Sequence, residues 1–337
     1  MLDDARASRG GRRLPFKAQT RFSESGVMTV SSVNLHIGDS VPARRELVLK
    51  DGEISFLEWK QEKDLPALHF AHANGFNGMT YRSLLSPLAS RFHIRAWDAR
   101  GHGMTRLSAD PTDHRRWTIF RDDLIRFIEP FVEESGGPVL LGGHSMGGAT
   151  SLMVAAERPD LVRGLVLVDP VMVPRSARLM MKLFRMLGRK GGPLSLADGA
   201  ERRRAVFPDR ATMTKAYKGR GAFRTWPEEV IADYVEGGTK TRDDGQAELA
   251  CAPAWEAANF RAQDHDIWAD LARLQTPLTL IYAGIGSTCR APAPDLLGQR
   301  DPRATLLRIG RATHFIPMEF PDAVRREMLD LDARLGD

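Results

Sequence analysis

The chain has 337 residues, of which 42% are hydrophobic and 27% charged, an ordinary composition for a soluble globular protein. Its apolar runs stay below the about 18 residues of a membrane-spanning helix, and its first residues, MLDDARASRGGRR, lack the apolar region of a signal peptide, so we expect a cytoplasmic protein without a membrane span. The formal charge of +5 comes from scattered arginines rather than a basic face interleaved with aromatics, which argues against a nucleic-acid partner.

Residues 1–40 are polar and show no sustained periodicity, so we expect a partly disordered N-terminal extension. A different pattern begins at residue 41. The run ELVLKDGEISFLEW (46–59) predicts two strands that form a hairpin at Asp51 and Gly52, because Asp-Gly pairs favour tight turns.

Short apolar runs then alternate with helical patterns along the chain. Runs rich in Val, Ile and Leu suit strands that are buried on both faces, and their alternation with helices indicates a parallel sheet. We therefore predict an α/β fold with a mostly parallel, eight-stranded sheet and helices on both faces. After the hairpin, the expected strands are residues 67–73, 92–98, 138–144, 163–169, 277–284 and 304–310.

The alternation stops between Val171 and Gln263, where only helical patterns and loops follow the sixth strand. We predict a helical cap over residues 172–263, inserted into a core made of residues 41–171 and 264–337. One cap helix, ARLMMKLFRML, carries an apolar stripe that either packs on the core or lines an apolar pocket, formed by Leu179, Met180, Leu183, Phe184 and Leu187.

The segment LGGHSMGGA (141–149) joins a predicted strand to a predicted helix and places Ser145 at the joint. A sharp strand-to-helix turn holds its central residue at positive φ and requires small residues two positions before and after it. Gly143 and Gly147 satisfy both requirements. We therefore predict that Ser145 is a nucleophile at the carboxyl edge of the sheet, where ligands bind to open parallel sheets.

A serine hydroxyl needs a general base near neutral pH. Of the nine histidines, His314 follows the last predicted strand and precedes the final helix, so it lies on a loop at the same sheet edge. We predict that His314 is the base. His102, in the glycine-rich DARGHG, is expected to have a structural role in a turn, and Asp98 is assigned to the same turn.

A carboxylate must accept a hydrogen bond from the second ring nitrogen of the base. The sixth strand ends at Asp169, whereas the sequence after the seventh strand, YAGIGSTCRAP, has no acid before Asp295. We predict Asp169 as the acid and keep Asp295 as the alternative.

Two backbone amides must stabilise the negative oxygen of a tetrahedral intermediate. The turn directs the amide of Met146 toward the group that Ser145 attacks. The second amide is expected from HANGFNG (72–78), the loop after the third strand, where we predict Asn74, with Phe76 as the alternative.

Together, the segments HANGF, DARGHG, GHSMGG and ATHF resemble the α/β-hydrolase fold superfamily, in its serine-hydrolase branch with a helical cap. The resemblance spans roughly Glu46 to the C-terminus. It implies that Ser145 attacks, that His314 carries the proton and that the acid orients the histidine, and it implies no metal or organic cofactor. HANGF departs from the commoner His-Gly start. The missing acid after the seventh strand is a second departure, and some members carry the acid after the sixth strand instead.

A serine at the turn argues against dehalogenase or epoxide-hydrolase chemistry, for which similar members present aspartate. We therefore expect a carboxylesterase that cleaves small to medium, apolar esters, thioesters or lactones through an acyl-enzyme on Ser145. Two alternatives stay open: a C–C bond hydrolase or cofactor-free peroxidase of the same fold, and a non-catalytic ligand-binding member. Arg202 to Arg204 leave room for an anionic group on the substrate.

Overall fold

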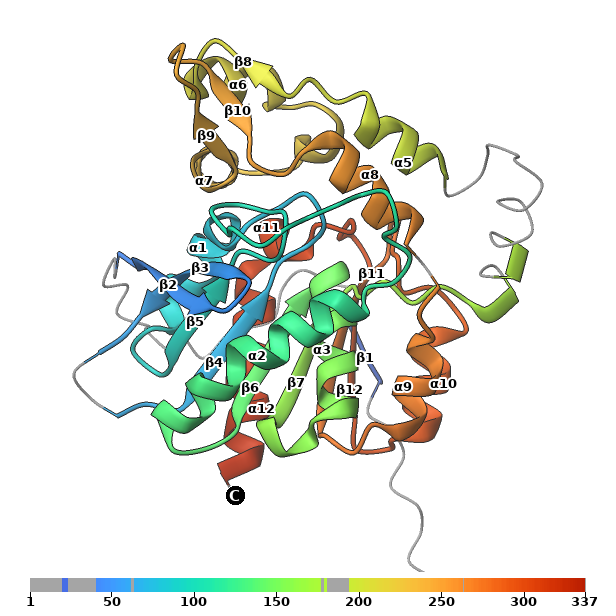
Figure 1. Cartoon of the computed structure of the whole chain (residues 1–337). Coiled ribbons are helices and arrows are strands. Elements are labelled where there is room, and N and C mark those ends of the chain that lie inside the picture. The colour runs from blue at the N-terminus through green and yellow to red at the C-terminus, as the bar shows by residue number, and fades with distance from the viewer. Residues whose placement is uncertain are drawn as a thin grey trace, which may run out of the picture.

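A nine-stranded sheet forms the centre of the computed structural model, which describes residues 20–23, 41–61, 64–176, 179–180, 194–262 and 264–336 (Figure 1). Its strand order is β1-β12-β11-β7-β6-β4-β5-β3-β2. The strands are β1 (Thr20–Ser23), β2 (Ala43–Leu49), β3 (Gly52–Trp59), β4 (Ala67–Ala71), β5 (His93–Trp97), β6 (Val139–His144), β7 (Val162–Val168), β11 (Leu278–Ala283) and β12 (Thr305–Ile309).

The predicted mostly parallel sheet of eight strands is confirmed, and β1 adds a ninth strand. All pairs from β1 to β5 along the sheet order are parallel, whereas β2, β3 and β5 pair antiparallel at one edge. The hairpin expected at Asp51 and Gly52 joins β2 to β3. Strand β1 lies within the N-terminal extension that we expect to be partly disordered, and Thr20 to Ser23 pair in parallel with Leu306 to Ile309 of β12.

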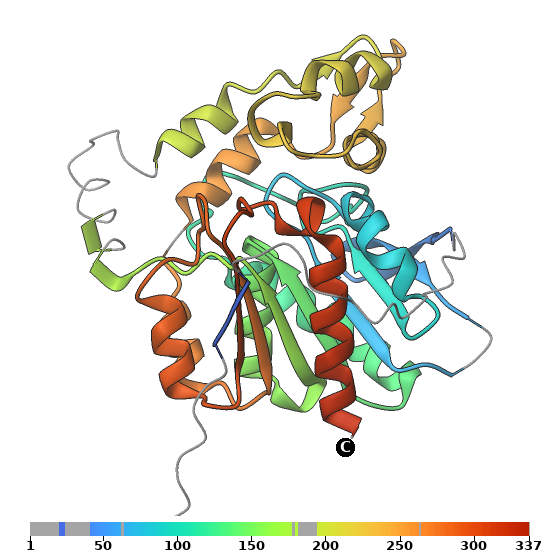
Figure 2. The same cartoon turned by 180° about the vertical axis from the view of Figure 1, so that it is seen from behind.

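Helices cover both faces of the sheet, which explains why β4 and β6 are buried along their whole length. Figure 1 shows α2 (Thr118–Ser135) and α3 (Met146–Glu157) on one face, and Figure 2 shows α12 (Pro321–Gly336) on the other. The remaining helices of the core are α1 (Arg82–Leu85), α9 (Ile267–Arg273), α10 (Ala293–Arg300) and α11 (Ile316–Glu319), with 3-10 turns η1 (Gly78–Tyr81), η2 (Ser86–Leu88) and η3 (Pro159–Leu161).

Between β7 and β11, the described chain from residue 194 to residue 262 lies over one end of the sheet (Figure 1). We call its residues 194–262 the inserted region. It consists of α5 (Leu194–Glu201), β8 (Val206–Phe207), α6 (Arg210–Tyr217), η4 (Gly221–Phe223), α7 (Glu228–Gly237), β9 (Thr239–Thr241), β10 (Ala247–Leu249) and α8 (Pro253–Arg261).

The expectation of helices and loops alone in this interval is wrong, because β8, β10 and β9 form a small antiparallel sheet. These strands are two or three residues long, and β9 is the sequence Thr-Lys-Thr with two exposed side chains, so no apolar run marks them. Of the predicted apolar stripe, Leu183, Phe184 and Leu187 lie outside the described residues. Leu179 and Met180 are exposed.

Within the described residues, no helix has the length and apolar character required to cross a membrane.

The junction between β6 and α3 is a close contact between two backbones. A Cβ atom built on Gly143 would lie 2.5 Å from the carbonyl carbon of Gly147, and one on Gly147 would lie 2.2 Å from the carbonyl oxygen of Ala71 in β4. Backbone atoms cannot move aside as the end of a side chain can. The prediction that both positions require small residues is confirmed.

We predict that Gly147→Ala lowers the free energy of unfolding by about 3 kcal/mol, because the added methyl group overlaps with the backbone of β4. Urea denaturation measures this loss. Gly137→Ala is the matched control, since a Cβ at Gly137 meets nothing within 4 Å, and its effect should stay within about 0.5 kcal/mol. Equal stability of the two variants would contradict the prediction.

Candidate active site

Ser145 occupies the turn between β6 and α3 in a backbone conformation that few residues other than glycine adopt. Its φ is 56° and its ψ is −116°. The surrounding structure holds this strained conformation, because the amide of Ser145 donates to Val168 O (3.0 Å) and its carbonyl accepts from the amides of Ala149 (3.1 Å) and Val171 (3.2 Å). The residue is only 8% exposed.

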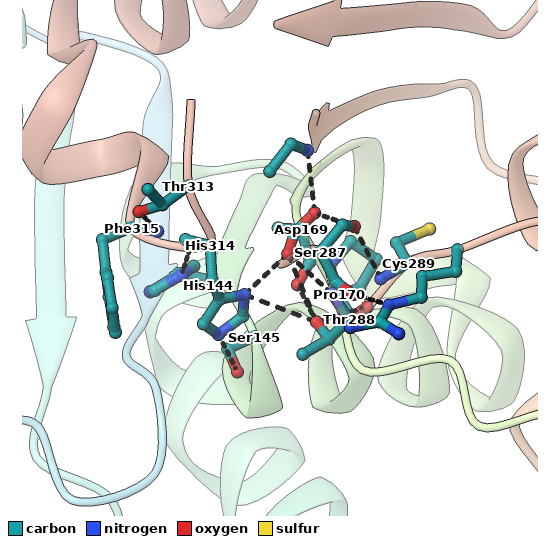
Figure 3. Close-up of polar contacts among 12 residues, drawn as sticks. His144, Ser145, Asp169, Pro170, Ser287, Thr288, Cys289, Thr313, His314 and Phe315 are labelled. Carbon is teal, nitrogen blue, oxygen red and sulfur yellow. Dashed lines mark hydrogen bonds and ion pairs between the residues drawn. The ribbon is translucent and has the colours of Figure 1, made fainter. Parts of the chain in front are cut away.

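His314 lies on the loop between β12 and α11 and faces Ser145 (Figure 3). Its Nε2 is 3.0 Å from the Oγ of Ser145, which is hydrogen-bonding distance. His144, the residue before the serine, donates a hydrogen bond from its Nε2 to the backbone carbonyl of His314 (2.9 Å). The last residue of β6 therefore fixes the loop that carries the histidine.

Asp169 completes a hydrogen-bonded line with these two residues. Its Oδ2 is 2.6 Å from His314 Nδ1, and the carboxylate makes Nδ1 the protonated ring nitrogen and leaves Nε2 to accept from the serine hydroxyl. Asp169 follows β7 directly and, like Ser145, has a positive φ (42°). The other predicted acid, Asp295, lies on α10. Among the predicted residues, the structure thus brings together Ser145, His314 and Asp169.

The loop after β11 holds the Asp169 carboxylate in place (Figure 3). Oδ1 accepts from the Ala283 amide (2.9 Å) and the Ser287 hydroxyl (2.5 Å), and Oδ2 accepts from the Thr288 amide (2.9 Å). Burial by itself raises the pKa of Asp169, but the hydrogen bonds from His314, Ser287 and Ala283 lower it below its ordinary value, so the carboxylate stays ionised.

Sequence reasoning missed Ser287 and Thr288. The signal was present in GIGSTC, because this segment places two hydroxyl residues shortly after the strand that pairs with β7. A carboxylate in the loop after β7 needs hydrogen-bond donors from the end of the neighbouring strand. That strand is β11, which pairs directly with β7.

The amide of Met146 is the first N–H of α3, and such N–H groups have no partner within their own helix. In the loop between β4 and η1 (residues 72–77, the β4–η1 loop), three of four consecutive amides are already used. Ala73 donates to the Tyr81 hydroxyl (3.1 Å), Gly75 to His102 Nε2 (3.0 Å) and Phe76 to Ala73 O (3.1 Å).

The amide of Asn74 donates to no atom of the described chain. Of the two predicted candidates, Asn74 therefore has a free donor, whereas the donor of Phe76 closes the turn onto Ala73.

A model of the alpha/beta hydrolase family matches residues 70–327, which is more than half of the chain. The matched stretch includes Ser145, Asp169 and His314. The chain belongs to the alpha/beta hydrolase family.

Two curated relatives match parts of this alpha/beta hydrolase. The 2-(acetamidomethylene)succinate hydrolase of Mesorhizobium japonicum is 35% identical over 104 residues, which are 31% of this chain and 35% of the relative. The monoglyceride lipase of Homo sapiens is 33% identical over 150 residues, which are 43% of this chain and 48% of the relative. The chain thus spans about a third to a half of the length of these relatives.

Solved structures match over most of the chain. The structure of E-2-(acetamidomethylene)succinate hydrolase has a TM-score of 0.71 at 20% identity and covers 87% of this chain and 99% of that one. An esterase of M. tuberculosis has a TM-score of 0.62 at 22% identity and covers 86% and 92%. At these identities, the likeness shows the fold alone.

Three buried histidines frame the site of this alpha/beta hydrolase, each in a tautomer that its partners dictate. His72 Nδ1 donates to Ala73 O (2.7 Å) and its Nε2 accepts from the Ala99 amide (2.8 Å).

His102 Nδ1 donates to Arg100 O (2.9 Å), and its Nε2 accepts from Gly75. The structural role predicted for His102 is confirmed. Asp98 accepts from the Met104 amide (3.0 Å) in the turn to which it was assigned, and also from the Gly78 amide of η1 (2.9 Å).

The third histidine, His144, connects the two loops of the site. The Ala73 amide donates to Tyr81 Oη, Tyr81 O–H donates to His144 Nδ1 (2.8 Å), and His144 Nε2 donates to His314 O. This chain of hydrogen bonds requires a neutral imidazole. Burial lowers the pKa of His144, and the neighbouring His314 lowers it further.

Aromatic rings from the inserted region and the core meet beside the site. Phe76 and Phe315 stack with their centroids 6.3 Å apart, and Trp226 meets them edge-on at 5.3 Å and 5.5 Å. Arg203, one of the cations considered for an anionic substrate group, instead forms an ion pair with Glu256 (2.6 Å).

One group of described residues has the composition of a metal site. Glu58, His93 and Glu134 offer ligand atoms within 4.8 Å of one another. Arg95 pairs with both carboxylates and Lys60 pairs with Glu134, so the negative charge is already balanced. We interpret this group as an ion-pair network.

We predict that the protein loses stability as the pH falls below about 6.5, because its buried histidines must remain neutral. Burial and the nearby His72 lower the pKa of His102 to about 3, whereas Asp98 opposes this shift. The unfolded chain takes up the proton first, so between pH 7.5 and pH 5.0 His102 alone should remove about 2 kcal/mol of the free energy of unfolding.

Urea denaturation of the wild type and of His102→Gln at both pH values tests this. Glutamine keeps an acceptor for the Gly75 amide but does not titrate. The variant should lose about 2 kcal/mol less than the wild type over this interval. The same pH dependence in both proteins would show that His102 does not contribute.

Proposed function

We propose that this alpha/beta hydrolase is a serine carboxylesterase that cleaves esters, or related thioesters and lactones, through an acyl-enzyme on Ser145. The observation that carries the proposal is the hydrogen-bonded line from the Asp169 carboxylate through His314 to the Ser145 hydroxyl. Such a line is the arrangement that a serine nucleophile requires.

In the proposed reaction, Ser145 Oγ attacks the ester carbonyl carbon while His314 Nε2 takes its proton. The ionised Asp169 stabilises the imidazolium that forms. The amides of Met146 and Asn74 donate to the negative oxygen of the tetrahedral intermediate. His314 then gives its proton to the leaving alcohol, and the Ser145 ester remains. Water attacks this ester with His314 again as the base, which releases the acid and restores the serine.

The surroundings of the site favour an apolar substrate. Phe76 follows Asn74 by two residues, Phe315 follows His314 directly, and Trp226 packs against both rings. The ion pair of Arg203 with Glu256 leaves this arginine without a free charge for an anionic substrate. Among the relatives, the names monoglyceride lipase and protein phosphatase methylesterase 1 describe ester hydrolysis, which agrees with the proposal.

We predict that the protein hydrolyses p-nitrophenyl esters with short to medium acyl chains and that Ser145→Ala lowers kcat by a factor of about 10⁴ or more. Initial rates across a series of acyl chain lengths measure this. Ser151→Ala is the matched control, because Ser151 is a buried serine of α3 whose hydroxyl donates to Gly142 O. Absence of turnover with every chain length, together with no labelling of Ser145 by a fluorophosphonate, would overturn the proposal.

We predict that Asp169→Asn lowers kcat by a factor of about 10³ to 10⁴, because the amide no longer stabilises the imidazolium or fixes the tautomer of His314. Asp295→Asn should leave kcat within a factor of about 2 of the wild type, since α10 carries this residue outside the hydrogen-bonded line. Steady-state kinetics on one ester compares the two variants. The reverse ranking would assign the acid to Asp295.

A further inference from the structure

The β4–η1 loop touches the inserted region through its side chains and its backbone. The Asn74 side chain donates to Glu256 O (3.0 Å) and accepts from Asn259 Nδ2 (2.8 Å), both on α8. The Tyr234 hydroxyl, on α7, donates to the backbone carbonyl of Gly75 (3.2 Å). The residue that carries the free amide is therefore held directly by the inserted region.

The core holds the same loop from the other side. His72 donates to the Ala73 carbonyl, which precedes the Asn74 amide in the same peptide group, and His102 accepts from the Gly75 amide, which belongs to the next one. The third peptide group joins the Gly75 carbonyl to the Phe76 amide; its carbonyl accepts from Tyr234, and its amide donates to Ala73 O within the loop. Three consecutive peptide groups are thus oriented, and the inserted region holds the carbonyl of the third.

Arg203 fixes the Tyr234 hydroxyl. Its Nη2 donates to Tyr234 Oη (2.8 Å) and its Nη1 forms the ion pair with Glu256. Because the tyrosine oxygen accepts from a cation, its own proton is directed to the Gly75 carbonyl and the bond is strengthened. Glu256 also packs against Gly75, since a Cβ there would lie 2.7 Å from Glu256 Oε1. Gly75 has a φ of +75°, so the backbone can pass this close in a turn.

We propose that Tyr234, held by Arg203, is a positioning residue that directs the Asn74 amide toward the negative oxygen of the intermediate. The inserted region then sets the rate of the chemical step as well as the shape of the substrate site. This inference rests on the proposed esterase function. Displacing or misdirecting this amide costs the transition state more stabilisation than it costs the bound ester, so the loss appears in kcat.

Tyr234→Phe tests the inference, with Tyr217→Phe as the matched control. Both hydroxyls accept from Arg203 Nη2, at 2.8 Å and 3.2 Å, and both rings pack against Phe223. Of these two hydroxyls, only that of Tyr234 also bonds to a described residue of the β4–η1 loop, namely Gly75. Both variants remove a hydroxyl that accepts from Arg203, but only Tyr234→Phe also removes the hydrogen bond to the Gly75 carbonyl.

We expect Tyr234→Phe to lower kcat about 10-fold or more with KM within about 2-fold, and Tyr217→Phe to keep both values within about 2-fold. The affinity of an alkyl trifluoromethyl ketone gives a second readout. In its adduct, Ser145 Oγ bonds to the ketone carbon, the serine proton moves to His314 and the ketone oxygen becomes negative. Its dissociation constant should rise in Tyr234→Phe by the same factor as kcat falls.

The extent of labelling by a fluorophosphonate at completion should be one group per chain in the wild type, Tyr234→Phe and Tyr217→Phe. This checks that each variant is folded at the active site. Unchanged kcat and ketone affinity in a fully labelled Tyr234→Phe would overturn the inference. So would an equal loss in both variants, because it would assign the effect to the Arg203 network rather than to the Gly75 contact. A wild type without turnover and without labelling would instead overturn the proposed function, and the inference with it.

Discussion

The close contact of α3 with β6 and β4 is the constraint on which the rest of the site depends. Because Gly143 and Gly147 have no side chain, the strand can turn directly into the helix, and the turn leaves Ser145 at positive φ. This geometry places the first amide of α3 beside the serine and points the end of β6 at the loop of His314. A side chain at either glycine would separate these backbones, and it would move Ser145 away from the first amide of α3 and from the loop of His314.

Neutral histidines connect the parts of the site that backbone packing leaves separate. His144 and Tyr81 join the loop of His314 to the β4–η1 loop, and His72 and His102 hold that loop against the core. An imidazole can donate with one nitrogen and accept with the other, which neither an amine nor a carboxylate does at neutral pH. Burial keeps these rings neutral and lowers the pKa of His72 to about 4. The same burial that makes the frame rigid also makes it sensitive to acid.

The inserted region and the core share the β4–η1 loop, so they are not independent parts. The Asn74 side chain donates to Glu256 O of α8, and the Gly75 carbonyl accepts from Tyr234 of α7. The Gly75 amide donates to His102 of the core. The partly buried Arg203–Glu256 ion pair stabilises the inserted-region side of this contact. A change in the inserted region therefore acts on the same loop that we propose to stabilise the intermediate.

Local patterns along the chain were sufficient to predict the alternation of strands and helices, the hairpin of β2 and β3, and the tight turn at Ser145, because each depends on residues close together in the chain. The sequence also identified Asp169 and His314 as candidates, since parallel strands end at one edge of a sheet.

Other features depend on partners far apart in the chain. The donors Ser287 and Thr288 are more than a hundred residues from Asp169, and the Asn74 side chain is held by Glu256 and Asn259, which are also more than a hundred residues away. The pairing of Arg203 with Glu256 and the short strands β1 and β8 to β10 have no local apolar pattern to reveal them. These features become visible only in the folded chain, because hydrogen bonds and ion pairs depend on which groups folding brings together, and spacing along the chain does not record that.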